Sequence, residues 1–236
     1  MQNRIPFVLA SALKRKYAVR GHFYNVRLSS GLLVQCRSVL EIELRPQAHQ
    51  DGGAKILLPD AVFVMMNPGS SEPLEGTIAN ITEDAFPITQ KQLVPTKPDT
   101  TQYQVMRIMS FFGWEYVRVL NLSDLRNPNS SKFLNEVRLL ESRNQFFAHT
   151  IFSDERTAEL SSAMIRKGDA PIVCAWGVNT GLSPLINLAI TAIKCGGRYV
   201  GLAKSESEHL FRHPLQRPQR AKQEWLDDMC SLLGKN

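Results

Sequence analysis

The stretch FVMMNPGSS (residues 63–71) changes abruptly from apolar residues to a tight polar turn. Pro68 and Gly69 favour a sharp turn, and Gly69 lets the backbone approach a ligand closely. Asn67 is then held at the end of the apolar run, with Ser70 following the turn. An amide is no general base near neutral pH, but it can fix a water molecule beside a strong electrophile. The alternative is local: an Asn in a turn often bonds its own backbone.

Two further side chains follow apolar runs in the same way. Asn121 in VLNL (119–122) offers a donor and an acceptor side by side, a pattern that can pair with the Watson–Crick edge of a base. His213 in RHPLQRP (212–218) can donate a hydrogen bond to an oxygen that gains negative charge as a bond breaks. For Asn121 the alternative is turn chemistry, and for His213 it is a partly exposed surface residue.

Apolar runs rich in Val, Ile and Leu alternate with amphipathic segments over most of the chain, which is typical of a parallel sheet covered by helices on both faces. The predicted strands are 60–66, 116–122, 170–176 and 198–204, and the predicted helices are 99–112, 130–142, 154–167, 183–195 and 219–233. Serines are the expected N-caps of the helices at 130 and 183. We therefore predict an α/β fold with a four-stranded parallel sheet sandwiched by helices.

The polar segments that follow these strands should lie together. Binding sites in such sheets gather at the carboxyl ends of the strands. The turn at 67–71, the loop after Asn121, the WGVNTG segment (176–181) and the HPLQRP segment (213–218) are therefore expected on one edge of the sheet. We expect Asn67 and His213 to face each other across one cleft.

The N-terminal quarter has a different pattern. Residues 22–46 read as extended strands with a hairpin turn at Ser-Ser-Gly (29–31), and residues 49–55 read as a flexible joint. We predict that residues 1–55 form an N-terminal β-hairpin appendage and that residues 56–236 form the α/β domain.

Positive charge is concentrated in two places. The net charge is +6, and residues 1–50 carry eight Lys and Arg against two Glu. A second basic group, Arg212, Arg217, Arg220 and Lys222, lies near the other end. Such patches suit a polyanion such as nucleic acid, and a solvated basic surface is the alternative.

Several classes of protein are disfavoured by what the sequence lacks. The four cysteines are far apart with no CxxC pair, so we expect no metal site, and Cys174 and Cys195 are expected to be buried thiols. No apolar run reaches about 18 residues and the N-terminus does not resemble an export signal, so we expect a cytoplasmic protein with no membrane partner. No dinucleotide or P-loop motif occurs, and no cofactor is expected.

Taken together, four segments resemble the uracil-DNA glycosylase superfamily. MNPGSS resembles the water-positioning Gly-Ile-Asn-Pro-Gly motif of the mismatch-specific branch, and VLNL resembles the strand that ends in the pyrimidine-reading Asn of the classical branch. IVCAWG resembles the third strand of the superfamily, and RHPLQRP resembles the His-Pro-Ser-Pro-Leu loop with its catalytic His and minor-groove wedge. The same motifs resemble a bacterial domain family of unknown function with this fold. The resemblance covers about residues 60–235.

The resemblance implies a DNA glycosylase that flips out a pyrimidine, excises it and leaves an abasic site, with DNA as partner. Its implied roles by residue are catalysis by Asn67 and His213; substrate contacts by Pro68, Gly69, Ser70, Phe86, Asn121 and Trp176; and DNA contacts by Arg212, Leu215, Arg217 and Arg220. Leu215 is the expected wedge, with Phe211 as a second candidate. No lysine is expected at the strand ends, so strand cleavage by β-elimination is not expected.

Three departures from the family pattern concern the substrate. Met65 replaces a glycine, the His213 loop is two residues shorter than the family motif, and Phe86 is the single aromatic residue of the 70–98 loop. We therefore expect a damaged or modified pyrimidine, either of the uracil type or a modified cytosine such as those of phage DNA, and both repair and phage defence remain open. Two other functions also remain open: a non-catalytic nucleic-acid-binding protein of the same fold, and an enzyme acting on free nucleosides.

Overall fold

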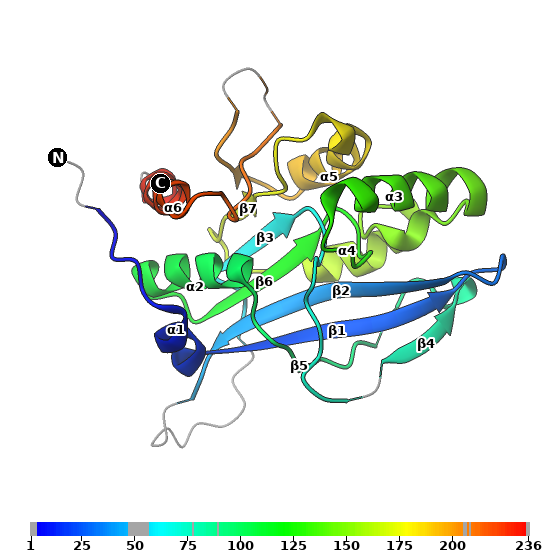
Figure 1. Cartoon of the computed structure of the whole chain (residues 1–236), viewed down its shortest axis with the longest axis horizontal. Helices are drawn as coiled ribbons and strands as arrows, with labels where there is room; N and C mark the ends of the chain where they lie inside the picture. Colours follow the sequence, from blue (N-terminus) through cyan, green and yellow to red (C-terminus); the bar gives the residue numbers. More distant parts are fainter. Residues whose placement is uncertain are drawn as a thin grey trace.

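A computed structural model describes residues 4–46, 57–76, 78–88, 90–204, 207 and 209–234 of the chain. Within these residues eight strands form one sheet in the order β4-β1-β2-β6-β3-β7-β8, and β5 pairs with β1 (Figure 1). The strands are β1 Tyr17–Arg27, β2 Leu33–Leu44, β3 Ala61–Met65, β4 Ala79–Thr82, β5 Val94–Pro95, β6 Tyr116–Asn121, β7 Ile172–Cys174 and β8 Tyr199–Val200.

The four strands that the sequence predicted form the parallel part of this sheet. β3 lies between β6 and β7, β8 pairs with β7, and all three pairings are parallel. All five residues of β3 are buried, because helices cover both faces of the sheet at its centre. The mixed α/β class is thereby confirmed, although β7 and β8 are much shorter than predicted.

Two groups of helices flank the sheet (Figure 1). The helices are α1 Ala10–Lys16, α2 Thr100–Phe112, α3 Ser130–Asn144, α4 Thr157–Ala163, α5 Ser183–Cys195 and α6 Gln219–Leu233. α1, α2 and α6 contribute to one apolar core, whereas α3, α4 and α5 contribute to another on the opposite face. The predicted helices at 99–112, 130–142, 183–195 and 219–233 are present with small changes at their ends.

Both predicted serine N-caps are wrong. The N-cap of α3 is Asn129, whose side chain accepts a hydrogen bond from the Lys132 N–H at 3.0 Å. The N-cap position of α5 is Leu182, because a short 3-10 turn precedes the helix and Ser183 is already helical. The helix predicted to reach residue 167 ends at Ala163.

The N-terminal hairpin is an integral part of the sheet. β1 and β2 pair in antiparallel fashion, and β2 also pairs with β6, from Leu40 opposite Val119 to Glu43 opposite Tyr116. We predicted that the hairpin is an appendage to a four-stranded sheet. Because β2 pairs with β6, the hairpin strands instead belong to the same, larger sheet. The predicted boundary between residues 55 and 56 lies outside the described residues, and the division into two domains stays a prediction.

Candidate functional site

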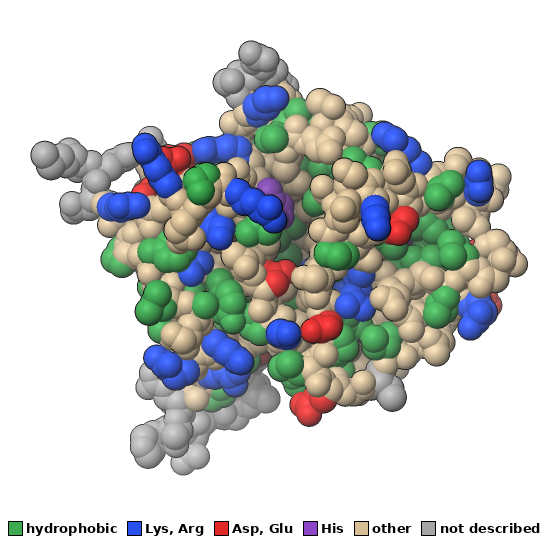
Figure 2. Space-filling view, in the orientation of Figure 1, with side chains coloured by type: hydrophobic (Ala, Val, Ile, Leu, Met, Phe, Trp, Pro, Cys, Tyr) green, Lys and Arg blue, Asp and Glu red, His purple; other side chains and the backbone are tan. Residues whose placement is uncertain are grey.

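A pocket of about 160 Å³ lies at the carboxyl ends of β3 and β6. Figure 2 shows a histidine side chain beside a hollow near the middle of one face, with Lys and Arg side chains around it. The pocket walls contain seven of the residues predicted from the sequence: Asn67, Pro68, Gly69, Ser70, Asn121, His213 and Leu215. Segments separated by almost 150 residues along the chain therefore meet at one pocket.

Asn67 is fixed at the pocket by its own side chain. Its Nδ2 donates hydrogen bonds to the backbone oxygen of Asn127 at 2.7 Å and to that of Leu125 at 3.4 Å. Within the described part of the chain its Oδ1 accepts no hydrogen bond. Gly69, at φ +62°, supplies the left-handed conformation that the turn requires. The amide oxygen of Asn67 is therefore the atom that is free to act on a ligand.

Asn121 is fully buried at the end of β6, and neither its Nδ2 nor its Oδ1 has a hydrogen-bond partner among the described residues. Each buried polar atom without a partner costs about 1–3 kcal/mol. The local role considered for this residue, a bond to its own turn, is absent. A donor and an acceptor side by side in a pocket wall are what a nucleobase edge would pair with.

The segment that carries His213 is anchored on two sides. The backbone N–H of Arg212 donates to the Leu202 oxygen at 2.8 Å, and the indole N–H of Trp225 on α6 donates to the Arg212 oxygen at 3.0 Å. The Nδ1 atom of His213 accepts a hydrogen bond from the Leu215 N–H at 3.1 Å. The ring proton is therefore on Nε2, which leaves that nitrogen as a donor.

The imidazole of His213 is neutral at physiological pH. Burial lowers its pKa from 6.5 to about 4, because a charged ring loses more solvation than a neutral one. Its ring lies in the pocket wall and is only partly accessible to solvent. A neutral ring with its proton on Nε2 can donate to an oxygen that becomes anionic.

Arg37 is a further residue of the pocket wall, and nothing in the sequence pattern predicts it there. It comes from β2, is 3% exposed, and its Nε and Nη1 have no hydrogen-bond partner in the described structure. Burial lowers its pKa to about 10, while Asp99 and Asp124 act in the opposite direction. No local sequence signal marks this residue, because its place depends on the pairing of β2 with β6.

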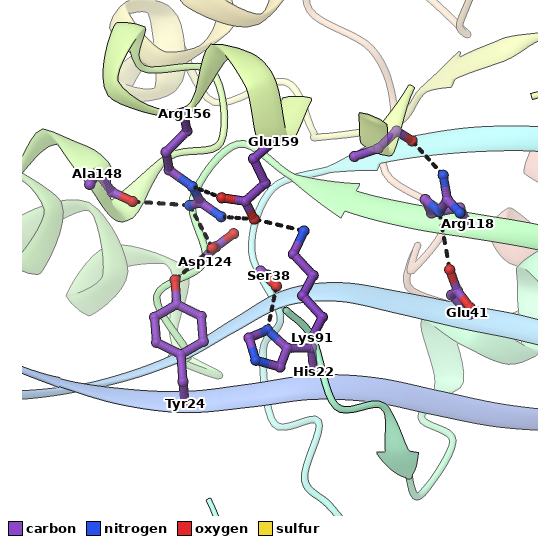
Figure 3. Close-up of polar contacts among 11 residues, drawn as sticks. His22, Tyr24, Ser38, Glu41, Lys91, Arg118, Asp124, Ala148, Arg156 and Glu159 are labelled. Atoms are coloured by element: carbon purple, nitrogen blue, oxygen red, sulfur yellow. Dashed lines mark hydrogen bonds and ion pairs between the residues drawn. The ribbon is translucent and has the colours of Figure 1, made fainter. Parts of the chain in front are cut away.

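A buried ionic network fixes the loop after β6 (Figure 3). Asp124 accepts hydrogen bonds from the Tyr24 hydroxyl and from Nη1 of Arg156, both at 2.7 Å. Arg156 also forms an ion pair with Glu159 at 2.7 Å, and Lys91 bonds the same carboxylate. Breaking one partner of a buried pair typically costs about 3–5 kcal/mol. The network therefore anchors the start of the loop whose Leu125 and Asn127 oxygens accept from Asn67.

Two predicted substrate contacts lie away from the pocket. Trp176 is fully buried, donates its N–H to the His209 oxygen at 2.9 Å and packs against Phe211. Phe86 packs in T-shaped geometry against Tyr24 and Phe146 on the other face of the sheet. Neither residue lines the pocket, and no Phe, Tyr or Trp does so among the described residues. Both belong to the apolar packing instead.

Of the four predicted DNA-contacting residues, Leu215 alone is in the pocket wall. Leu215 is 40% exposed and also lines the pocket, as a wedge must. Phe211, the second wedge candidate, is buried and unavailable. Arg212 pairs with Asp228 and Arg220 pairs with Glu224 at 2.7 Å, whereas Arg217 is exposed with no ion pair to a described residue.

A larger cavity of about 320 Å³ lies beside the buried network on the opposite face. Its charged side chains pair with one another: Lys91 with Glu159 at 2.7 Å and Arg118 with Glu41 at 3.2 Å (Figure 3). A ligand would have to compete with these pairs. The smaller pocket, whose buried polar groups lack partners, is therefore the better candidate site.

The described residues contain no group of three or more His, Cys, Asp or Glu that could hold a metal ion. Cys36, Cys174 and Cys230 are buried free thiols, and burial raises the pKa of each. In the part of the chain that the structure describes, no helix is long and apolar enough to span a membrane.

No protein-family model, curated protein or solved structure matches this chain.

Proposed function

We propose that the protein is a monofunctional DNA glycosylase of the uracil-DNA glycosylase-like fold. It would flip a damaged or modified pyrimidine out of DNA and hydrolyse its glycosidic bond, leaving an abasic site. One observation carries the proposal: Asn121 presents a buried donor and acceptor, both unpartnered, in the same pocket as Asn67 and His213. A flipped pyrimidine, with adjacent donor and acceptor atoms on its Watson–Crick edge, would satisfy both.

In the proposed reaction the bond between the sugar C1′ and the base nitrogen breaks first. Its electron pair moves to the base, and positive charge develops on the sugar. The Nε2–H of His213 would donate to the base oxygen that gains negative charge, and Asn121 would hold the base edge. Removing one such donor typically costs about 10²–10³-fold in rate.

Water completes the reaction at the cationic sugar. The free Oδ1 of Asn67 would accept a hydrogen bond from this water and direct its oxygen toward C1′. The new bond forms between the water oxygen and C1′, and the proton that the water loses balances the charge on the departing base. No general base is required, because the sugar cation is itself a strong electrophile.

The amine needed for a second reaction is not in the pocket. No lysine of the described chain lines it, so no Schiff base with the sugar is expected and the DNA strand would remain uncut. Leu215 at the pocket mouth would fill the space that the flipped base leaves in the duplex, and Arg217 and Arg220 would contact phosphates.

The decisive experiment incubates the protein with duplex and single-stranded DNA that carries one altered pyrimidine, followed by alkali. The panel includes uracil, oxidised pyrimidines and C5-modified cytosines. Cleavage that requires alkali and is absent with Asn67→Ala supports the proposal. Intact strands across the panel, together with salt-sensitive DNA binding, would favour a non-catalytic nucleic-acid-binding protein. Release of bases from free nucleosides, with no preference for DNA, would favour a nucleoside hydrolase.

A further inference from the structure

Arg37 is buried in the pocket wall without the partner that a buried guanidinium normally has. Its Nε and Nη1 atoms make no hydrogen bond within the described structure, and its side chain forms no ion pair there. Two carboxylates lie near enough to act on Arg37, but neither bonds it. One oxygen of Asp99 accepts from the Gln102 N–H at 2.9 Å, and one oxygen of Asp124 bonds Tyr24 and Arg156 while its other oxygen has no partner among the described residues. Burying a charge without an ion-pair partner is costly. The presence of the Arg37 guanidinium in a pocket wall therefore indicates that an acceptor group of a ligand pairs with it.

Strand order fixes which side of the ligand Arg37 faces. The sheet runs β2-β6-β3, so Asn121 on β6 stands between Arg37 on β2 and Asn67 after β3. Arg37 and Asn67 therefore enter the pocket from opposite sides of Asn121. If Asn67 directs water to the sugar, Arg37 faces the end of the base that is farthest from the glycosidic bond, where C4 and the neighbouring C5 lie.

We propose that Arg37 is a specificity residue that binds an anionic, bidentate acceptor, such as a carboxylate, on the C5 side of the flipped pyrimidine. The inference rests on the proposed glycosylase function. A guanidinium offers parallel N–H groups that match the two oxygens of a carboxylate, whereas the single O4 atom of uracil would satisfy only part of the fork. The favoured substrates are thus pyrimidines enlarged by an oxygen-rich, negatively charged substituent.

A phosphate of the DNA backbone is a second group that offers anionic oxygen acceptors to a guanidinium. The strand order argues against it, because phosphates are attached to the sugar, on the Asn67 side of the pocket. The burial of Arg37 argues against it as well, since residues that contact phosphates usually lie on the accessible surface. The experiment separates the two sources by varying the base while the phosphates stay the same.

The test measures single-turnover excision from duplexes that differ only in carrying uracil or 5-carboxyuracil. We expect the wild-type protein to prefer 5-carboxyuracil by about 10–100-fold and Arg37→Met to lose most of this preference, because a charge-assisted bidentate contact is removed. Arg37→Lys should recover only part of it, since an ammonium lacks the fork. Arg126→Met is the matched control: Arg126 is also partly buried but stacks over Phe23, and its loss should leave the preference unchanged.

Two further measurements make the outcomes distinct. Calorimetry with free 5-carboxyuracil and free uracil tests binding without catalysis, and the melting temperature of Arg37→Met should not fall, because an unpaired charge is removed. If excision is absent but 5-carboxyuracil binds in an Arg37-dependent way, the glycosylase proposal fails and the specificity role stands. If Arg37→Met slows excision from both duplexes equally, or if the variant protein melts many degrees lower than the wild type, the specificity role is overturned while the glycosylase function stands. Failure of every binding and excision assay overturns both.

Discussion

The side-chain nitrogen of Asn67 donates to the backbone oxygen of Asn127 at 2.7 Å. This bond joins the turn after β3 to the loop after β6, and it decides which end of the amide faces the pocket. The nitrogen is occupied by the protein, so the oxygen is left for a ligand. One hydrogen bond thus links the packing of two strand ends to the polarity of the pocket.

Asn67→Ala should reduce excision by at least about 10²-fold, since the acceptor for the attacking water is lost. DNA binding, measured by fluorescence anisotropy, should persist. Asn67→Asp keeps an acceptor but places a carboxylate against the Asn127 oxygen, and we expect a lower melting temperature for this variant. Unchanged excision by Asn67→Ala would show that the water is positioned by another group.

Asn121→Leu should separate stability from function. The substitution removes two buried polar atoms that have no partner, so thermal unfolding should show an unchanged or higher melting temperature. Excision and binding of free pyrimidine bases should both fall by about 10²-fold, because the edge of the base loses its partners. A clear drop in melting temperature would instead indicate a structural bond for Asn121 in solution.

The lowered pKa of His213 predicts how the stability of the protein depends on pH. Its pKa is about 4 in the folded protein against 6.5 for an ordinary histidine, so the unfolded chain takes up a proton between these values while the folded protein does not. The contribution of the neutral His213 ring to the free energy of unfolding is fully present above pH 6.5 and is lost as the pH falls toward 4. Urea unfolding of the wild type and His213→Gln should therefore differ in slope within this window. His22 has a similarly lowered pKa and remains in both proteins, so it cancels in the comparison.

The catalytic role of His213 gives a second readout in the same pH range. Excision should be independent of the protonation of His213 from about pH 5.5 to 8, because the neutral ring is the donor throughout. An activity limb near pH 6.5 that disappears in His213→Gln would show that the ring titrates normally and that its assignment as a neutral donor is wrong.

Gly201 controls the position of the His213 segment. A Cβ atom at this position would lie 2.5 Å from the Phe211 ring and 2.6 Å from the Cys174 oxygen. Gly201→Ala should therefore lower stability by about 1–3 kcal/mol and displace Phe211, with a loss of excision. Gly168→Ala is the matched control, because its Cβ would meet no atom within 4 Å. Equal stability of the two variants would contradict the packing at Gly201.

Replacing Arg217 or Arg220 should weaken the dependence of DNA binding on salt concentration. Each phosphate contact that is removed lowers the slope of log K against log salt by about 1, so Arg217→Ala and Arg220→Ala should each show this decrease. Lys194 is the control, because it lies in the last turn of α5, which packs in the other apolar core from α6. If Lys194→Ala alone changes the slope, DNA binds another face.

Local patterns predicted the parallel part of the fold well. The buried run at 61–65, the capped start of α2 and the Pro-containing start of α5 are all encoded by neighbouring residues, so their positions could be read from the sequence. The meeting of Asn67, Asn121 and His213 followed from one general rule about parallel strands. Their catalytic and base-reading roles stay predictions.

What the sequence could not reveal depends on contacts between distant segments. The pairing of β2 with β6 has no local signal, and without it nothing distinguishes Arg37 from the other Lys and Arg of residues 1–50. Trp176 and Phe86 were predicted to touch substrate because of the resemblance to the glycosylase superfamily. The apolar residues against which they pack instead lie far away in the chain.

The pairing of β2 with β6 also limits how the protein can be dissected. A fragment that starts after the hairpin would leave the backbone groups of β6 unpaired along one side, and such open edges recruit other chains. It would lack Arg37 as well. Truncation at the hairpin is therefore expected to yield insoluble material, and any family of relatives that shares this pocket should carry the hairpin or another strand in its place.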